Sequence, residues 1–389
     1  MSFGILLAIA LAGLGGPLLG LSERRFVPVV IGEIAAGVLV GKTGLEIVDP
    51  GEPTIAFLAE VGFAMLMLTA GMHLPLRDPR LAASLRGGAV LAAIVGVLAV
   101  PAGFAAAAIA GTSHAAVYAV VLASGSAAVL LPALQETKAE GPDVLAVMAQ
   151  VTIADVVTIL SVPIVLQPQR TVHAVIGAAL VAVAVAALYG VARLLVGRRW
   201  VDHLRRMSKQ RHWALDLRLS LLVLFLLAWI AQKSGTSVLI AGFGAGVTVA
   251  LIGGPKRLST QMRGVADGFF IPLYFVVLGA ELDLSGLVRD PAMIALTAAL
   301  AALNVAIHLM ATAIVRRPPS AGLTASAQLG VPAAVASLGL SAGVLSGTVA
   351  TAIVAAAVVS LGVCTLGVGR LIDGERGEHA AGPEAAART

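Results

Sequence analysis

Asp155 is the residue whose position most clearly requires a chemical explanation. It lies near the middle of residues 150–165, QVTIADVVTILSVPIV, in an apolar segment long enough to cross a bilayer. An ionised aspartate at the centre of a membrane helix costs roughly 2.5 to 3.5 kcal/mol, so such residues usually face a water-filled cavity or an ion pathway. On a helical period Thr152 and Thr158 flank it on one small polar face. Asp155 is therefore our first functional candidate; the alternative is an inert carboxyl hydrogen-bonded to a neighbouring helix.

The composition places the chain in a membrane. Hydrophobic residues make up 59% of it and charged residues 12%, and the mean hydropathy is +0.98; about a quarter of the residues are charged in ordinary globular proteins. The net charge of +5 would suggest nucleic acid as a partner of a soluble protein. Here the basic residues fall between apolar segments, where positive-inside sorting explains them. We expect an integral, all-α polytopic membrane protein that binds no nucleic acid.

Apolar runs recur along nearly the whole sequence and predict about thirteen transmembrane helices, each able to span the roughly 30 Å of hydrocarbon. The first run lacks the positive n-region of a signal peptide, so we expect it to be retained as the first helix. The predicted spans are 3–21, 27–41, 53–74, 88–110, 114–134, 143–166, 172–196, 214–232, 236–253, 267–284, 291–315, 320–343 and 347–370.

Basic residues alternate between rich and poor connections. The connections after odd-numbered spans are rich in arginine and lysine, and the connection after span 7 holds six of them. By the positive-inside rule the odd connections are cytoplasmic, which predicts an external N-terminus and a cytoplasmic C-terminus. A miscounted span would disturb this alternation, which favours thirteen. The connections after even-numbered spans hold only Lys42, Arg170, Lys233 and Arg289.

The longest hydrophilic connection, RRWVDHLRRMSKQRH, follows span 7 and leaves six spans on each side of that helix. Two six-helix halves of opposite orientation are typical of inverted-repeat transporters. We predict one transmembrane domain over 1–371, with repeat one at about 3–166, a linker helix at about 172–196 and repeat two at about 214–370. The remaining segment, 372–389, is rich in Gly, Ala and Glu and is expected to be a disordered cytoplasmic tail.

Two corresponding spans contain helix-breaking residues. Span 5 is interrupted by Ser124-Gly125-Ser126, with Pro132 beyond, and span 12 by Gly330-Val331-Pro332. Gly and Pro free backbone groups that only a protein-lined or watery cavity can satisfy inside a membrane. Paired breaks in corresponding positions therefore indicate a binding site near the midplane, although structural kinks are the alternative.

Six segments, taken together and in order, are similar to one known family. The chain resembles the monovalent cation:proton antiporters, especially the branch with bacterial sodium/proton exchangers and Kef-type potassium/proton systems. The segments are VPVVIGEIAAGVLVGKTGL (27–45), LAEVGFAMLMLTAGMHLPL (58–76), VLASGSAAVLLPALQE (121–136), the Asp155 segment, GTSVLIAGFGAGV (235–247) and FFIPLYFVVLGAELDL (269–284).

The resemblance implies a fold, a site and a location. The expected fold has a core domain, with two crossed broken helices and the aspartate, that moves against a dimerisation domain to alternate access. Asp155 corresponds to the carrier carboxylate, Ser126 to a candidate ligand of the monovalent cation, and Ser124 to a weaker one. A homodimer in a bacterial inner membrane is the expected form.

Several positions depart from the family pattern. Electrogenic members have two adjacent acids where this chain has Ala154 and Asp155, and a lysine at the position aligned with Asn304. The resemblance therefore implies electroneutral exchange of one proton for one monovalent cation. Asn304 is expected to replace the lysine structurally and to modulate the site. Gly125 and Ala127 stand where many members have Thr and Pro, which leaves the ion selectivity open.

Such exchange needs one carboxylate that binds either a proton or a cation. Burial favours the neutral acid because the charged form loses hydration, so protons can compete at cellular pH. Sodium and potassium take oxygen ligands, namely carboxylate, hydroxyl, freed carbonyls and water. Thr152 and Thr158 are candidates, although threonine in a membrane helix often bonds its own backbone. The choice between sodium and potassium stays open.

No enzyme motif or cofactor site is evident. The GFGAG at 242–246 follows no strand and is expected to serve close helix packing rather than dinucleotide binding. We therefore predict a secondary-active cation:proton antiporter without a cofactor, with sodium or potassium and protons as its substrates and the lipid bilayer as its surroundings. The alternatives are a proton-coupled carrier of an organic solute on the same scaffold and a non-transporting membrane subunit.

Overall fold

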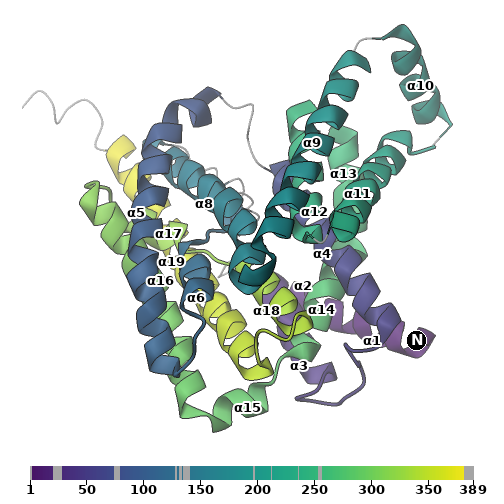
Figure 1. The fold of residues 1–389 in the computed structure, drawn as a ribbon. Helices are drawn as coiled ribbons and strands as arrows, with labels where there is room; N and C mark the ends of the chain where they lie inside the picture. The colour runs from purple at the N-terminus through teal and green to yellow at the C-terminus, as the bar shows by residue number, and fades with distance from the viewer. Residues whose placement is uncertain are drawn as a thin grey trace, which may run out of the picture. The chain divides into compact units, whose positions relative to one another are not determined.

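The computed structural model describes residues 2–20, 29–73, 79–127, 129–130, 134, 141–195, 198–211, 213–234, 236–252 and 256–380. Every regular element in these ranges is helical (Figure 1), as predicted. Among the described residues, nine helices are long and apolar enough to cross a membrane. Shorter apolar helices cover Phe3–Leu19, Val29–Val40 and Val238–Ile252. The number thirteen and the inverted repeat stay predictions, and Pro132 lies outside the described residues.

The chain forms two compact units, and each combines segments from both sides of the predicted linker helix. Unit 1 consists of Met1–Gly16, Gly32–Arg77 and Leu166–Leu282. Its helices include α1 (Phe3–Gly13), α3 (Val29–Val40, from Gly32 on), α4 (Pro53–His73), α9 (Thr171–Leu195), α10 (Arg199–Gln210), α11 (Leu215–Ser234), α12 (Val238–Ile252), α13 (Lys256–Val265) and α14 (Ile271–Glu281), with one π-helical turn, η2 (Ala266–Phe270), before α14.

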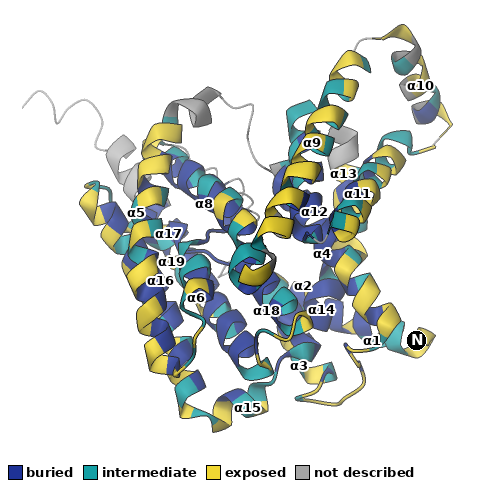
Figure 2. Ribbon diagram, viewed as in Figure 1, coloured by how far each residue is buried: buried dark blue, intermediate teal, exposed yellow. Residues whose placement is uncertain are grey.

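Glycines let α4 and α12 approach closely inside unit 1. A Cβ atom added to Gly242 would lie 2.6 Å from the carbonyl oxygen of Ala64, and one added to Gly71 would lie 2.5 Å from that of Phe243. Larger residues would therefore push the two backbones apart. The expectation that GFGAG serves helix packing is confirmed, and the two helices are largely buried (Figure 2).

The predicted linker helix, α9, presents a different surface. Apolar side chains such as Val172 and Val183, each 68% exposed, lie along it, and Figure 2 shows that much of its length is exposed. An apolar face of this size is unfavourable in water. It therefore needs the lipid or protein cover that a membrane provides.

Unit 2 consists of Pro17–Ile31, Asp78–Val165 and Asp283–Thr389. It contains all the predicted site residues. Its helices include α5 (Pro79–Ala110), α6 (Ala115–Ala123), α8 (Pro142–Leu166), α15 (Leu284–Arg289), α16 (Pro291–Ile314), α17 (Pro319–Ala325), α18 (Gly330–Ser341) and α19 (Gly347–Ala380).

The structure corrects the location of the second break. Span 12 is divided between α17 and α18 at residues 326–329, just before the predicted Gly330-Val331-Pro332. Gly330 begins α18, and Pro332 lies in the first turn of that helix, where its missing N–H removes no helical hydrogen bond. These residues therefore start the second half-helix and do not interrupt it.

Two other boundaries differ from expectation. The last helix, α19, continues to Ala380, so 372–380, expected to be disordered, are helical; residues 381–389 lie outside the described part. The hydrophilic connection after span 7 also contains a helix, α10, because its few apolar residues recur at helical spacing.

Candidate functional site

Asp155 lies on α8 and is buried, with 6% of its surface exposed. Its Oδ2 accepts a hydrogen bond of 2.9 Å from the backbone N–H of Ala127, which is 28 residues away in the sequence. Among the described residues of unit 2, Asp155 is the only acidic residue that is buried. The predicted carrier carboxylate is therefore placed directly against the first break.

In the first break, the described residues show the end of α6 and a helical turn that begins at Ser126. The carbonyl oxygen of Val121 accepts both the N–H and the hydroxyl of Ser124, the C-cap residue that follows α6. After the break, the carbonyl oxygen of Ser126 accepts the N–H of Leu130 at 3.0 Å. Ser126 is thus the N-cap residue of a new helical turn and Ala127 is its first residue. Asp155 faces the positive end of that turn, which favours a negative charge.

Gln328 connects the two breaks. Its Nε2 donates to the carbonyl oxygen of Val121 at 2.7 Å and to Oδ1 of Asn304 at 2.9 Å. Asn304 donates in turn to the carbonyl oxygen of Ser326 at 2.8 Å and to Oγ of Ser360 at 3.0 Å. All of these residues are buried or contribute a backbone atom at a break. This network fixes the end of α6 to the segment between α17 and α18.

Asn304 therefore holds the breaks together through neutral hydrogen bonds. The sequence indicated its structural role, but Gln328 was missed. The residue type could have identified it. A side-chain amide inside a predicted membrane span must form hydrogen bonds within the protein, and Gln328 lies in span 12.

The four predicted hydroxyl ligands differ in their hydrogen bonding. Ser124 donates to the last turn of α6 at 2.7 Å, and Thr158 donates to the backbone of its own helix at 2.6 Å. Ser126 and Thr152 are buried, with 3% and 5% exposure, and no described residue forms a hydrogen bond with either hydroxyl. Ser126 and Thr152 thus retain the capacity to bind another group.

Gly125 is required by the packing of the break against α8. A Cβ atom at this position would lie 2.8 Å from Cγ1 of Val151 and 3.2 Å from its Cα. Real Cβ atoms are rarely found so close to their neighbours. The glycine at this position is therefore explained by the short distance between this segment and α8.

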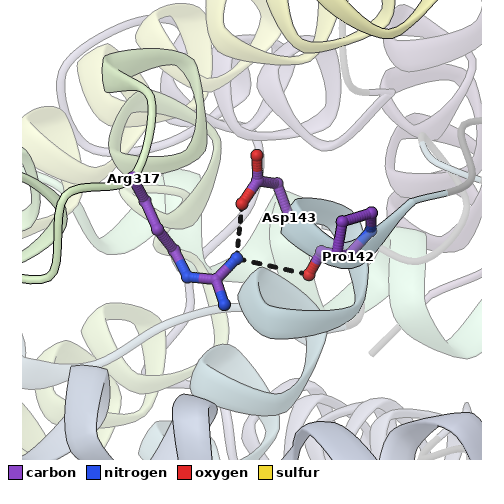
Figure 3. Close-up of polar contacts among 3 residues, drawn as sticks. All are labelled: Pro142, Asp143 and Arg317. Carbon is purple, nitrogen blue, oxygen red and sulfur yellow. Dashed lines mark hydrogen bonds and ion pairs between the residues drawn. The ribbon is translucent and has the colours of Figure 1, made fainter. Parts of the chain in front are cut away.

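An ion pair lies at the start of α8. Arg317, which follows α16, donates through its guanidinium to the carboxylate of Asp143 and to the carbonyl oxygen of Pro142 (Figure 3). Asp143 lies in the first turn of α8, where the helix dipole also favours its charge. The helix that carries Asp155 is thus joined to the connection between α16 and α17.

Comparison with known proteins gives matches over most of the chain. A family model described as "Sodium/hydrogen exchanger, transmembrane" matches residues 6–373. The putative Na(+)/H(+) antiporter YjbQ of Bacillus subtilis (strain 168) is 24% identical over 287 residues, which cover 68% of this chain and 45% of that protein. The chain therefore spans less than half the length of this relative.

Two further matches cover a larger share of the matched protein. The high-affinity Na(+)/H(+) antiporter NhaS3 of Synechocystis sp. is 24% identical over 342 residues, which cover 75% of this chain and 70% of that protein. Among solved structures, the sodium proton antiporter MjNhaP1 from Methanocaldococcus jannaschii at pH 8 has a TM-score of 0.66 and 15% identity, with coverage of 95% of this chain and 98% of that one. The latter likeness shows a shared fold.

Proposed function

Because the chain belongs to the sodium/hydrogen exchanger transmembrane family, and is thus an integral membrane secondary transporter and not an enzyme, we propose that it exchanges a monovalent cation for protons by alternating access. Sodium or potassium is the proposed cation. The observation that carries this proposal is the buried carboxylate of Asp155, held by the Ala127 N–H at the start of a helical turn. A group in that position can be neutralised either by a proton or by a cation.

The proposed cation site consists of oxygen atoms around Asp155. Its carboxylate is the central ligand, and the hydroxyls of Ser126 and Thr152 are the candidates whose hydrogen-bonding capacity is still available. Ser124 and Thr158 remain weaker candidates, because each hydroxyl already donates to backbone. Oxygen ligands suit sodium and potassium alike.

Coupling follows from competition at one carboxylate. A cation binds the ionised form, and a proton removes the charge that attracts the cation, so each displaces the other. The described part of unit 2 has a single buried acid, and the neutral Asn304 stands in place of a lysine. One carboxylate carries one cation in one direction and one proton in the other, so no net charge is moved. We therefore propose electroneutral exchange.

The remaining features of the proposal rest on the sequence and on the division of the chain into two units. Unit 2, with both breaks, would be the core domain, and unit 1 would contain the dimerisation surface of a homodimer. The charge alternation supports a cytoplasmic C-terminus in a bacterial inner membrane. The inverted repeat is supported by the division of the chain, since each unit takes segments from both sides of α9.

The test is proton movement in proteoliposomes exposed to sodium, potassium and lithium across a range of pH. We expect cation-dependent proton flux with the parent protein and none with Asp155→Asn. Asp143→Asn, which changes the half-exposed acid at the start of the same helix, is the matched control and should retain exchange. Undiminished exchange in Asp155→Asn would refute the proposal, and flux driven by an imposed membrane potential would refute electroneutrality.

A further inference from the structure

The amphipathic helix α10 is a feature that the proposed exchange does not use. It lies between the membrane helices α9 and α11 in unit 1, at the ends of both (Figure 1). Residues 198–211 contain a single acid, Asp202, and several bases. The bases are Arg198, Arg199, Arg205, Arg206, Lys209 and Arg211.

Short connections keep α10 near the bilayer surface. α9 ends at Leu195 and α11 begins at Leu215, so only three residues precede α10 and four follow it. Connections of that length reach at most roughly 10 to 14 Å. The Oγ of Ser208 accepts the N–H of Leu215 at 3.1 Å, which fixes the end of α10 to the first turn of α11. Both ends of α10 therefore lie within roughly 10 to 14 Å of the membrane helices, a distance comparable to one Debye length.

The two faces of α10 differ in character. Val201, Leu204 and Met207 recur every three residues on one side, and Leu204 is 37% exposed. Arg199 and Arg206, seven residues apart, are exposed on the opposite side. Such a helix favours the plane of the membrane interface, with its apolar side toward the acyl chains and its basic side among the headgroups.

An aromatic residue extends this surface. The guanidinium of Arg211 lies 5.4 Å from the ring centroid of Trp213, which is 38% exposed. Tryptophan is enriched at membrane interfaces because one end of its side chain is apolar and the other is polar. The basic and apolar features therefore continue from α10 into the start of α11.

We propose that α10, with Arg211 and Trp213, binds the headgroups of anionic phospholipids in the leaflet that it faces. The positive charges of α10 are complementary to the negative headgroups, and anionic lipids attract basic segments next to membrane helices. The apolar side and the two short connections favour lipid over a soluble acidic partner. The inference rests on the membrane position of α9 and α11 and does not require that the protein exchanges ions.

The test measures tryptophan quenching in the full-length protein. In a Trp229→Phe background the remaining tryptophans are Trp200 and Trp213, and the protein is reconstituted with brominated phosphatidylglycerol or brominated phosphatidylcholine at equal mole fraction. We expect stronger quenching by phosphatidylglycerol, which salt reduces. The preference is the ratio of quenching by phosphatidylglycerol to quenching by phosphatidylcholine. The double variant Arg199→Gln/Arg206→Gln should lower this ratio by up to about fivefold for each charge removed.

Two further variants control the result. Arg86→Gln/Arg263→Gln removes the same charge elsewhere and should keep the preference, and Arg199→Lys/Arg206→Lys should keep it because the charge is retained. Equal quenching by both lipids in the parent, or equal loss in the two glutamine variants, would overturn the proposal. Lipid-independent quenching together with binding of an acidic protein to α10 would also overturn it. Because quenching is measured without ion flux, a failure of exchange and a failure of lipid binding are distinguishable.

Discussion

The backbone N–H of Ala127 donates a hydrogen bond of 2.9 Å to the carboxylate of Asp155. This bond joins the start of the helical turn at Ser126 to the middle of α8, so the turn and the buried acid are held together. A proline at this position would have no N–H to donate. Ala127 therefore supplies a donor that a proline could not.

The Ala127→Pro variant tests that donor. Proline is well tolerated at the first position of a helix, so the substitution removes the hydrogen bond with little change of backbone. Hydrogen bonds to charged groups contribute about 1.5 to 3 kcal/mol. Without this bond the ionised carboxylate is less stable and holds its proton more tightly. We expect the pH of half-maximal exchange to rise by roughly one to two units, measured as proton flux in proteoliposomes.

Ala127→Gly is the control, because it keeps the N–H. Its pH profile should match that of the parent. An unshifted profile in Ala127→Pro would show that the hydrogen bond does not influence proton binding.

Gly125→Ala tests the packing of the first break. The new Cβ would meet Val151 at 2.8 to 3.2 Å, and overpacking of this kind costs typically about 1 to 3 kcal/mol. We expect a lower thermal unfolding midpoint in detergent and slower exchange. Val151→Ala should partly restore both, because it removes the Cγ1 atom nearest to the added carbon.

Gly96→Ala on α5 is the matched control for that experiment. A Cβ atom there meets nothing within 4 Å, so the variant should be neutral or slightly more stable, since alanine favours helix more than glycine. Equal destabilisation by Gly96→Ala and Gly125→Ala would contradict the packing explanation.

Gln328→Leu tests the network between the breaks. The substitution leaves Oδ1 of Asn304 buried without the donor that it has at 2.9 Å, which costs about 1 to 3 kcal/mol. We expect a correspondingly lower unfolding midpoint. Gln232→Leu, which removes a bond to the exposed Glu60, should change stability much less.

A double-mutant cycle sharpens this test. Replacing both partners of a buried hydrogen bond by apolar groups costs less than leaving one unpaired, so Gln328→Leu/Asn304→Leu should destabilise by less than the sum of the two single variants. Additive effects would show that the two amides act independently.

The ion pair of Asp143 and Arg317 should contribute little to stability. The two side chains are 30% and 28% exposed, and exposed pairs contribute roughly 1 kcal/mol or less. We expect Arg317→Gln to lower the unfolding midpoint slightly at low salt and less at high salt. A large loss that is independent of salt would show that the backbone bond to Pro142 dominates.

Much of the fold could be predicted because hydropathy is a property of each segment by itself. The all-α membrane class and the family follow from apolar runs and from six ordered motifs, and both are confirmed. The second break was placed a few residues too late. Gly330 and Pro332 were interpreted as the interruption, but a Pro in the first turn is compatible with helix. The local sequence did not distinguish the end of one helix from the start of the next.

The sequence by itself determined that a carboxylate lies in an apolar segment, because the cost of burying Asp155 follows from its neighbours along one helix. Only the tertiary structure decided what meets that carboxylate. The donor from Ala127 is 28 residues away, and the bond from Gln328 to Val121 links residues 207 apart. Such pairs depend on how separate helices pack, and an apolar surface specifies burial without specifying which polar group lies on the other side.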